Sequence, residues 1–382
     1  MSTAVSAERE AILNTLRDFC EAEIRPHVMR WDEAQEFPRE VFRKLGELGF
    51  LGVFFPEKYG GSGLTYMDYQ AIVEEIASVD PSVALALAAH NSLGSNHIFQ
   101  FGTEAQRQRY MPHLTSGDWL AAWGLTEAEA GSDSGGTKTT AVRDGGSWVL
   151  NGSKNFITNA SVAHVAVLMA VTDRAKGNRG ISAFIVDLDN PGIRVGKKEN
   201  KLGMRASDTC TLVMEDCRIP EGNLLGAEGS GWLDSMKILD GGRIGIAALS
   251  VGLARGAFEA ALTYSRQRRQ FGKPISEFEA IQFYLADMAT EIDAARLLTE
   301  RAASAKDAGR TVTKLSAQAK LFASEAAVRV TEHAIQIHGG YGFTKDFPVE
   351  KFYRDVRLCT VGEGTSEIQR LVIAKQLLSG DA

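Results

Sequence analysis

The sequence has few cysteines, no excess of positive charge and no long apolar run. Its four cysteines, Cys20, Cys210, Cys217 and Cys359, are scattered without a CxxC pair. This pattern excludes a disulfide-rich secreted scaffold and fits reduced thiols in a cytoplasmic protein. The net charge of −6 shows no excess of basic residues, so nucleic acid is not expected as a partner. No apolar run approaches the roughly 20 residues that span a bilayer, and the N-terminus lacks a secretory signal, so no membrane association is expected.

The motifs of several common enzyme classes are also missing. No GxGxxG or GxxxxGK[ST] motif occurs between a strand and a helix, which disfavours a Rossmann nicotinamide enzyme and a P-loop NTPase. No GxSxG elbow of a hydrolase is present. The seven histidines show no metal-ligand spacing; His333 and His338, five residues apart, fall on different faces of a helix. No metal site is therefore predicted.

The chain is long enough for more than one domain, and the secondary structure that its sequence pattern predicts changes twice. With 382 residues, 44% hydrophobic and 24% charged, it is typical of a soluble globular protein of two or three domains. Residues 1–118 have helical periodicity, residues 119–230 are rich in short β-type runs, and residues 231–382 are helical again. The predicted fold is therefore α+β and multidomain, with an N-terminal all-α domain, a middle antiparallel β-barrel or sandwich, and a C-terminal four-helix bundle.

Turn and periodicity signals support this division. In Trp148–Lys154 the dipeptide Asn151-Gly152 predicts a hairpin with a type I′ turn, and strands recur at roughly ten-residue spacing. In the C-terminal part, Ser276–Glu279 has the pattern of a capping box. The helix after it has the apolar seam of a packed bundle, formed by Ile281, Leu285, Met288, Ile292, Ala295 and Leu298.

Glu363 is the strongest candidate for a catalytic residue. It lies between Gly362 and Gly364, just before a helical segment over residues 366–378. Flanking glycines leave the carboxylate uncovered, so that a ligand can approach it closely. Partial burial would raise its pKa toward that of a working base. An ordinary helix N-terminus, where acidic residues are favoured, explains the same pattern.

Several polar, glycine-flanked patches accompany Glu363, and each also has an ordinary structural explanation. The stretch 123–133 suits a polar heterocycle or a phosphate, but it also reads as a loop closing a strand. In 154–159, Phe156 and Thr158 share a strand face, so an aromatic side chain could stack on a ring while a hydroxyl meets its edge. An ordinary half-buried strand would have the same pattern. Four cations in 266–273 could hold a pyrophosphate, or be solvated. Residues 336–343 end a helix with glycines, and Asp240 with Arg243 forms an acid and base pair on a helix.

Taken together and in this order, these motifs closely resemble the acyl-CoA dehydrogenase family of flavoproteins. The resemblance runs over nearly the whole chain and is closest to the short-chain (butyryl-CoA) type. Residues 240–247 (DGGRIGIA) and 363–374 (EGTSEIQRLVIA) carry most of it. It implies bound FAD, oxidation of an acyl-CoA to the trans-2-enoyl-CoA, a homotetramer, and an electron-transferring flavoprotein as electron acceptor.

The resemblance also implies a role for individual residues. Glu363 matches the base that removes the α-proton, while the β-hydrogen passes as hydride to flavin N5. The thioester carbonyl would be held by the Glu363 backbone N–H and a ribityl hydroxyl of FAD. The implied FAD contacts, several of them made across a subunit interface, are Trp123, Leu125, Thr126, Ser132, Phe156, Thr158, Arg268, Gln270, Gln336, Gly339, Gly340, Thr365 and Glu367. The implied contacts to acyl-CoA are Ser132, Asp240, Arg243 and Gly364.

Four positions depart from the family pattern and leave the substrate open. Phe156 stands where many relatives have Trp, Gly362 where many have Tyr, Ala128 where Pro is common, and Glu279 where a Gln often contacts FAD. A dehydrogenase for branched or aromatic acyl-CoA, or an acyl-CoA oxidase of the same fold, is an alternative. A non-catalytic scaffold that binds CoA or flavin belongs to a different class, and the presence of Glu363 argues against it.

Overall fold

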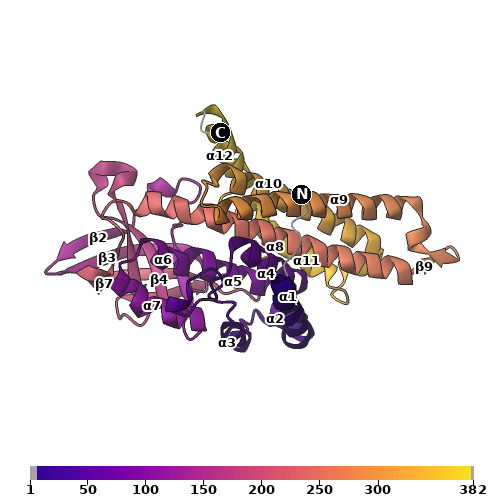
Figure 1. Cartoon of the computed structure of the whole chain (residues 1–382), viewed down its shortest axis with the longest axis horizontal. Helices are drawn as coiled ribbons and strands as arrows, with labels where there is room; N and C mark the ends of the chain where they lie inside the picture. The colour runs from indigo at the N-terminus through magenta and orange to yellow at the C-terminus, as the bar shows by residue number, and fades with distance from the viewer. Residues whose placement is uncertain (1–6, 380–382) are drawn as a thin grey trace.

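The computed structural model describes residues 7–379 and shows a β-sheet at one end of the molecule with two helical parts packed beside it (Figure 1). Helices come first in the chain, strands follow, and helices then continue to the C-terminal end. This order confirms the predicted fold class. The first helical part contains α1 (Ala7–Phe19), α2 (Val28–Ala34), α3 (Arg39–Glu47), α4 (Tyr66–Val79), α5 (Pro81–Ala89), α6 (Asn96–Phe101) and α7 (Glu104–Ser116).

The helices of this first part differ from the prediction in two places. The helical periodicity of the sequence runs through residues 7–28 without a break, but α1 ends at Phe19 and passes into a π-helix (Cys20–Ile24) and a 3-10 turn. Pro26 lies in that turn and, lacking an N–H, cannot continue the regular hydrogen-bond pattern. The sequence also gives no separate signal for α5, for the π-helix His90–Ser95 or for α6, because these segments are buried almost throughout and show no amphipathic period.

The middle part is an eight-stranded sheet in which β6, β7, β3, β2, β4, β5 and β8 are neighbours in that order and β1 pairs with β4. Most pairs are antiparallel, but β1 runs parallel to β4, and so does β2 at its single register pair. Trp148 and Phe184 meet edge to face in the core that β3 and β5 share. The strands are β1 (Ala121–Gly124), β2 (Thr140–Asp144), β3 (Ser147–Thr158), β4 (Val165–Val171), β5 (Ile181–Asp187), β6 (Ile193–Lys198), β7 (Thr209–Pro220) and β8 (Leu224–Leu225).

The predicted hairpin turn at Asn151-Gly152 is wrong. Both residues lie inside β3, and the turn between β2 and β3 is made by Gly145 and Gly146, with φ of 54° and 80°. The register between β3 and β7 shifts next to Gly152, so the dipeptide forms a β-bulge. Gly152 is required there because a Cβ at its φ of 143° would press against Thr139.

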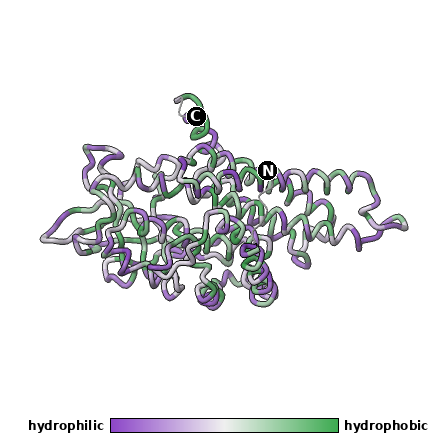
Figure 2. Tube along the Cα trace, viewed as in Figure 1, coloured by the Kyte–Doolittle hydropathy of each residue, from purple (hydrophilic) through white to green (hydrophobic). Residues whose placement is uncertain are grey.

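The C-terminal part is a bundle built around the long helix α8. Its helices are α8 (Gly231–Gln267), α9 (Glu279–Asp307), α10 (Thr313–His338), α11 (Val349–Val361) and α12 (Ser366–Leu378), with a short ribbon of β9 (Arg269–Gln270) and β10 (Lys273–Pro274). The predicted seam of α9 faces the core, and hydrophobic and hydrophilic residues alternate along the bundle helices (Figure 2). The predicted capping box is wrong, because residues 275–277 form a 3-10 turn and α9 begins after Phe278 without a side-chain cap.

Helix α8 is unusually apolar for its length. Within residues 7–379 it alone is long and apolar enough to cross a membrane by length and composition, and 78% of its most apolar window is buried inside the protein. Burial on this scale is expected of the central helix of a folded bundle.

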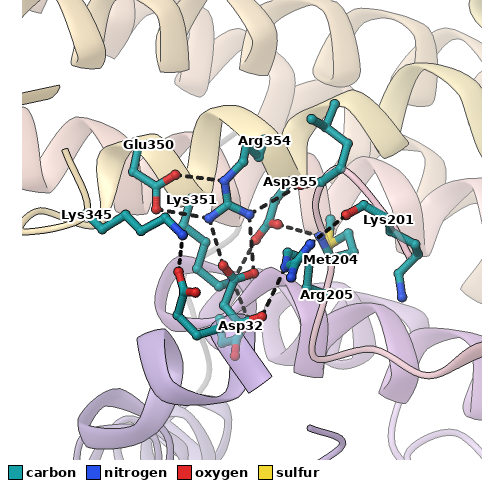
Figure 3. Close-up of polar contacts among 12 residues, drawn as sticks. Asp32, Lys201, Met204, Arg205, Lys345, Glu350, Lys351, Arg354 and Asp355 are labelled. Carbon is teal, nitrogen blue, oxygen red and sulfur yellow. Dashed lines mark hydrogen bonds and ion pairs between the residues drawn. The ribbon is translucent and has the colours of Figure 1, made fainter. Parts of the chain in front are cut away.

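The start of α11 is where the three parts of the chain meet (Figure 3). Lys351 Nζ contacts Asp80 Oδ1 at 2.9 Å and Asp355 Oδ2 at 2.6 Å, and all three residues are buried. Asp355 also accepts a hydrogen bond from the backbone N–H of Met204, which lies in the loop between β6 and β7. Arg354 binds Asp32 of α2 at 2.7 Å. Buried charges thus join α11 to the N-terminal helices and to the sheet.

Candidate active site

The loop between α11 and α12 carries Glu363 in a conformation that few residues adopt. Glu363 has a φ of 51° and Gly364 a φ of 91°. A left-handed backbone costs a non-glycine residue about 1–2 kcal/mol, so it persists only where the surroundings impose it. The loop ends at Thr365, whose hydroxyl accepts a hydrogen bond from the Ile368 N–H and caps α12. The predicted segment 366–378 is the observed helix α12.

The carboxylate of Glu363 is enclosed although the residue as a whole is partly exposed. Its Oε2 atom is buried and has no hydrogen-bond partner. Helix α8 makes room for it with Gly242, where a Cβ would overlap Oε2 and come within 3.0 Å of Leu93 Cδ2. Burial raises the pKa of Glu363 to about 7, while the nearby cations Lys320 and Arg243 oppose that rise. The group is therefore poised to gain or lose a proton near neutral pH.

Two residues that the sequence analysis did not single out hold this loop in place. Lys320 of α10 donates from Nζ to the Gly364 carbonyl oxygen at 2.7 Å. Gln369 of α12 donates from Nε2 to the same oxygen at 2.9 Å and to the Glu363 carbonyl at 3.3 Å. Both side chains are buried. The sequence offers no signal for Lys320, because lysines on helices are far more often solvated.

Asp240 and Arg243 lie one turn apart on α8 and bind each other at 2.7 Å. Thr313 at the start of α10 also donates a hydrogen bond to Asp240. Burial raises the pKa of Asp240 and lowers that of Arg243. Arg243 lies close enough to the Glu363 carboxylate to act on its pKa. The simple ion pair that the sequence left open as an explanation is present.

The predicted flavin-side residues of the middle part surround the end of β1. Trp123 lies on β1 and donates from Nε1 to His97 Nδ1 of α6 at 3.0 Å. Phe156 follows a bulge in β3, has a φ of 59° and exposes 63% of its surface. Leu125 is buried, Thr126 and Thr158 are partly exposed, and Ser132 is exposed. These six residues therefore belong to one region of the sheet domain.

A buried ion pair that the sequence analysis did not identify supports this region. Lys154 Nζ contacts Glu127 Oε1 at 2.6 Å and the Leu125 carbonyl oxygen at 3.3 Å. Glu127 also accepts hydrogen bonds from the backbone N–H groups of Lys138 and Thr139. Burial lowers the pKa of Lys154 to about 8. This pair fixes the loop that carries Leu125 and Thr126.

The third group of predicted residues lies at the other end of α8. Arg268, Gln270, Gly339 and Gly340 line a cavity of about 470 Å³ together with aromatic side chains. A Cβ at either glycine would meet nothing within 4 Å, so bare backbone faces open space. Gln336 lies nearby on the last turn of α10 and is exposed. Figure 1 places β9 at one end of the molecule and β2, β3 and β7 at the other. One chain does not bring the two groups together.

The remaining predicted residues lie around the loop between α11 and α12 that carries Glu363. Gly364 and Thr365 follow Glu363 directly, and Glu367 is exposed in the first turn of α12. Of the departures from the family pattern, Gly362 lies against α11, and an added Cβ would make a tight contact of 3.3 Å with the Leu358 carbonyl oxygen.

The chain matches known proteins over almost its full length. Family models described as the N-terminal, middle and C-terminal domains of acyl-CoA dehydrogenase match residues 6–118, 122–217 and 229–378. A probable acyl-CoA dehydrogenase, YngJ of Bacillus subtilis, is 49% identical over 99% of this chain and 100% of its own length. The short-chain specific acyl-CoA dehydrogenase of Clostridium acetobutylicum is 45% identical, with 99% and 100% covered.

Solved structures agree with these sequence matches. Butyryl-CoA dehydrogenase from Megasphaera elsdenii has a TM-score of 0.97 at 43% identity, covering 99% of this chain and 100% of that one. A chain from a study of the electron transferring flavoprotein of Acidaminococcus fermentans reaches 0.98 at 44%, with 99% and 100% covered. Glutaryl-CoA dehydrogenase from Mycobacterium smegmatis in complex with FADH2 reaches 0.93 at 32%, with 98% and 96% covered. The resemblance drawn from the motifs is confirmed, and the chain belongs to the acyl-CoA dehydrogenase family of enzymes.

Proposed function

We propose that this enzyme oxidises a short-chain acyl-CoA to the trans-2-enoyl-CoA with FAD as cofactor, and that Glu363 is the base. The observation that carries the proposal is the Glu363 carboxylate, which is buried, lacks a partner at Oε2 and has a pKa raised to about 7. A general base works best when its pKa lies near the operating pH. A carboxylate that only caps a helix would have its pKa lowered instead.

The residues of the chain account for the handling of the α-proton. That proton is weakly acidic, so the site must both accept it and stabilise the enolate charge away from water. Glu363 Oε2 accepts the proton. The Glu363 backbone N–H would donate to the thioester oxygen and so stabilise the enolate charge, as the family resemblance implies. When bound, FAD supplies the acceptor for the β-hydrogen, which leaves as hydride.

The two distant groups of predicted FAD contacts fit one cofactor shared between subunits. A cation, an amide and bare glycine backbone around a 470 Å³ cavity suit a phosphate-bearing group. The aromatic Phe156 on the sheet domain suits a flat ring. Helix α8 separates the two groups and has 37 residues, a length of about 55 Å. A single dinucleotide does not span that distance within one chain, which supports a homo-oligomer, in our proposal a homotetramer.

The substrate and the electron acceptor follow from the relatives. Short-chain specificity is stated for the Clostridium acetobutylicum enzyme, and butyryl-CoA for the Megasphaera elsdenii enzyme. We assign Asp240, Arg243, Gly364 and Ser132 to contacts with acyl-CoA. The likeness to a chain studied with an electron transferring flavoprotein supports such a protein as the acceptor. Gly362 leaves more room beside the base than a tyrosine would.

Anaerobic titration of the flavin tests this function. The oxidised flavin band near roughly 450 nm is expected to bleach on addition of C4 acyl-CoA more strongly than with C8 to C16, isobutyryl- or isovaleryl-CoA. Slow reoxidation in air would identify a dehydrogenase, and fast reoxidation an oxidase. Strongest bleaching with a longer or branched acyl-CoA would keep the reaction but assign a different substrate. Absence of bleaching with every thioester would overturn the proposal.

Gly242→Ala is expected to lower kcat by about 100-fold, because a displacement of about 1 Å at a reacting group has an effect of that size. The added Cβ would overlap Glu363 Oε2 and push the carboxylate aside. FAD content should stay unchanged. The matched control is Gly241→Ala on the same helix, whose Cβ would lie 3.1 Å from the Tyr66 hydroxyl. Steady-state kinetics that show equal losses in both variants would contradict a specific role of Gly242.

A further inference from the structure

Lys320 differs from the other fully buried lysines of the described chain. Three lysines, Lys154, Lys320 and Lys351, are at most 2% exposed. Lys154 forms an ion pair with Glu127 at 2.6 Å, and Lys351 with Asp355 at 2.6 Å. Within residues 7–379 Lys320 has no carboxylate within ion-pair distance. Its ammonium donates instead to the Gly364 carbonyl oxygen.

A buried ammonium without an ion-pair partner is expensive and rarely kept without a reason. Burial lowers the pKa of Lys320 to about 8, and Arg243 acts in the same direction. The carboxylates of Glu363 and Glu367 oppose this, whereas the Cys359 thiol, whose own pKa burial raises, would do so only once ionised. The cation therefore lies under the loop that carries the base, bonded to the peptide that follows it. A purely structural hydrogen bond to a carbonyl would be made as well by a neutral amide, as Gln369 shows at the same oxygen.

We propose that Lys320 is a positioning residue for the reaction. It fixes the carbonyl of Gly364, and with it the left-handed turn at Glu363, and its charge favours the ionised form of the buried Glu363 carboxylate. The proposal rests on the proposed function, in which Glu363 takes the α-proton.

The charges around Glu363 single out Lys320. Lys320 from α10 and Arg243 from α8 are the cations that oppose the rise in the pKa of Glu363, and Lys320 has the larger effect. The charge of Arg243 is offset by Asp240 at 2.7 Å. Tyr69 of α4 also faces the carboxylate, and burial keeps this phenol neutral by raising its pKa. Loss of Lys320 therefore removes the largest favourable interaction of the ionised base.

Lys320→Met removes both the hydrogen bond and the charge, and Lys320→Arg keeps a cation. In Lys320→Met the pKa of Glu363 should rise by about 1. Because the base must be ionised, the acid limb of the kcat profile should move to higher pH by the same amount. On the alkaline plateau, where Glu363 is ionised, kcat should still be about 10- to 100-fold lower than in the wild type, because the loop that carries Glu363 is displaced. Lys320→Arg should restore the acid limb to its wild-type position.

Titration of the Glu363 carboxyl group by infrared spectroscopy tests the proposal without relying on catalytic turnover. Infrared difference spectra of the holoenzyme follow the protonated carboxyl band of Glu363, which is assigned by its loss in Glu363→Gln. Lys314→Met, a half-buried lysine on the same helix, is the control and should leave band and profile unchanged. An unmoved carboxyl band and acid limb in Lys320→Met would overturn the proposal. If the wild type is not reduced by any acyl-CoA, the proposed function itself fails, whatever the infrared titration shows.

Discussion

Glu363→Gln is expected to lower kcat by about 10²- to 10⁴-fold, the usual contribution of a general base, while FAD and acyl-CoA still bind. Glutamine has nearly the same shape but cannot take up the α-proton. In the wild type kcat should rise with pH through the pKa of Glu363, about 7 in the free enzyme, since only the ionised form acts as a base. Stopped-flow flavin reduction with butyryl-CoA measures the chemical step directly. Unchanged reduction in the variant would move the base to another residue.

The same variant should be more stable than the wild type above neutral pH. Because burial raises the pKa of Glu363 from its ordinary 4.5 to about 7, ionising it in the folded protein costs about 3 kcal/mol. The folded state binds the proton more tightly than the unfolded state, so this cost is absent below about pH 4.5, grows between the two pKa values and is complete above 7. The gain in Tm of Glu363→Gln should be present at pH 8 and small at pH 5. A variant that loses both activity and stability at pH 8 would indicate a disrupted loop.

Local patterns marked Glu363 as the candidate base and predicted the helix after it, because both signals depend on neighbours in sequence. The glycines on either side of Glu363 and the cap at Thr365 act within a few residues, and α12 begins where they indicate. The cation beneath the base is 43 residues earlier on α10 (363 − 320). Its side chain is identified only when helices pack, since the sequence of a lysine on a helix is the same whether it is buried or solvated.

In the sheet, a clear local signal gave a wrong prediction because contacts between distant residues override it. Asn151-Gly152 has the composition of a hairpin turn, but pairing of β3 with both β2 and β7 keeps the chain extended and turns the dipeptide into a bulge. Long-range pairing outweighs a local preference of a fraction of a kcal/mol to about 1 kcal/mol. The predicted grouping of Arg268 and Gln270 with Phe156 on one cofactor is not seen within a single chain, because β9 and the sheet strand β3 lie at opposite ends of the molecule (Figure 1).

Lys351→Met is expected to destabilise the protein by about 3–5 kcal/mol at neutral pH, the range measured when one partner of a buried ion pair is removed. Asp80 and Asp355 would then face each other, buried and without the cation that contacts both at 2.9 and 2.6 Å. For a chain of 382 residues this lowers Tm by about 4–6 °C. Burial already raises the pKa of Asp355 with Lys351 present.

Without that lysine the carboxyl pKa rises further, so part of the lost stability should return as the pH falls and the carboxylate is protonated. The matched control is Lys345→Met, which removes another lysine from the same junction (Figure 3). Its pair with Glu33 is exposed on both sides, so a change of no more than about 1 kcal/mol is expected. Since α11 runs from Lys351 directly to the loop of Glu363, the variant should also reduce turnover near its lowered Tm. Equal shifts in Tm for the two variants would show that burial at this junction contributes nothing.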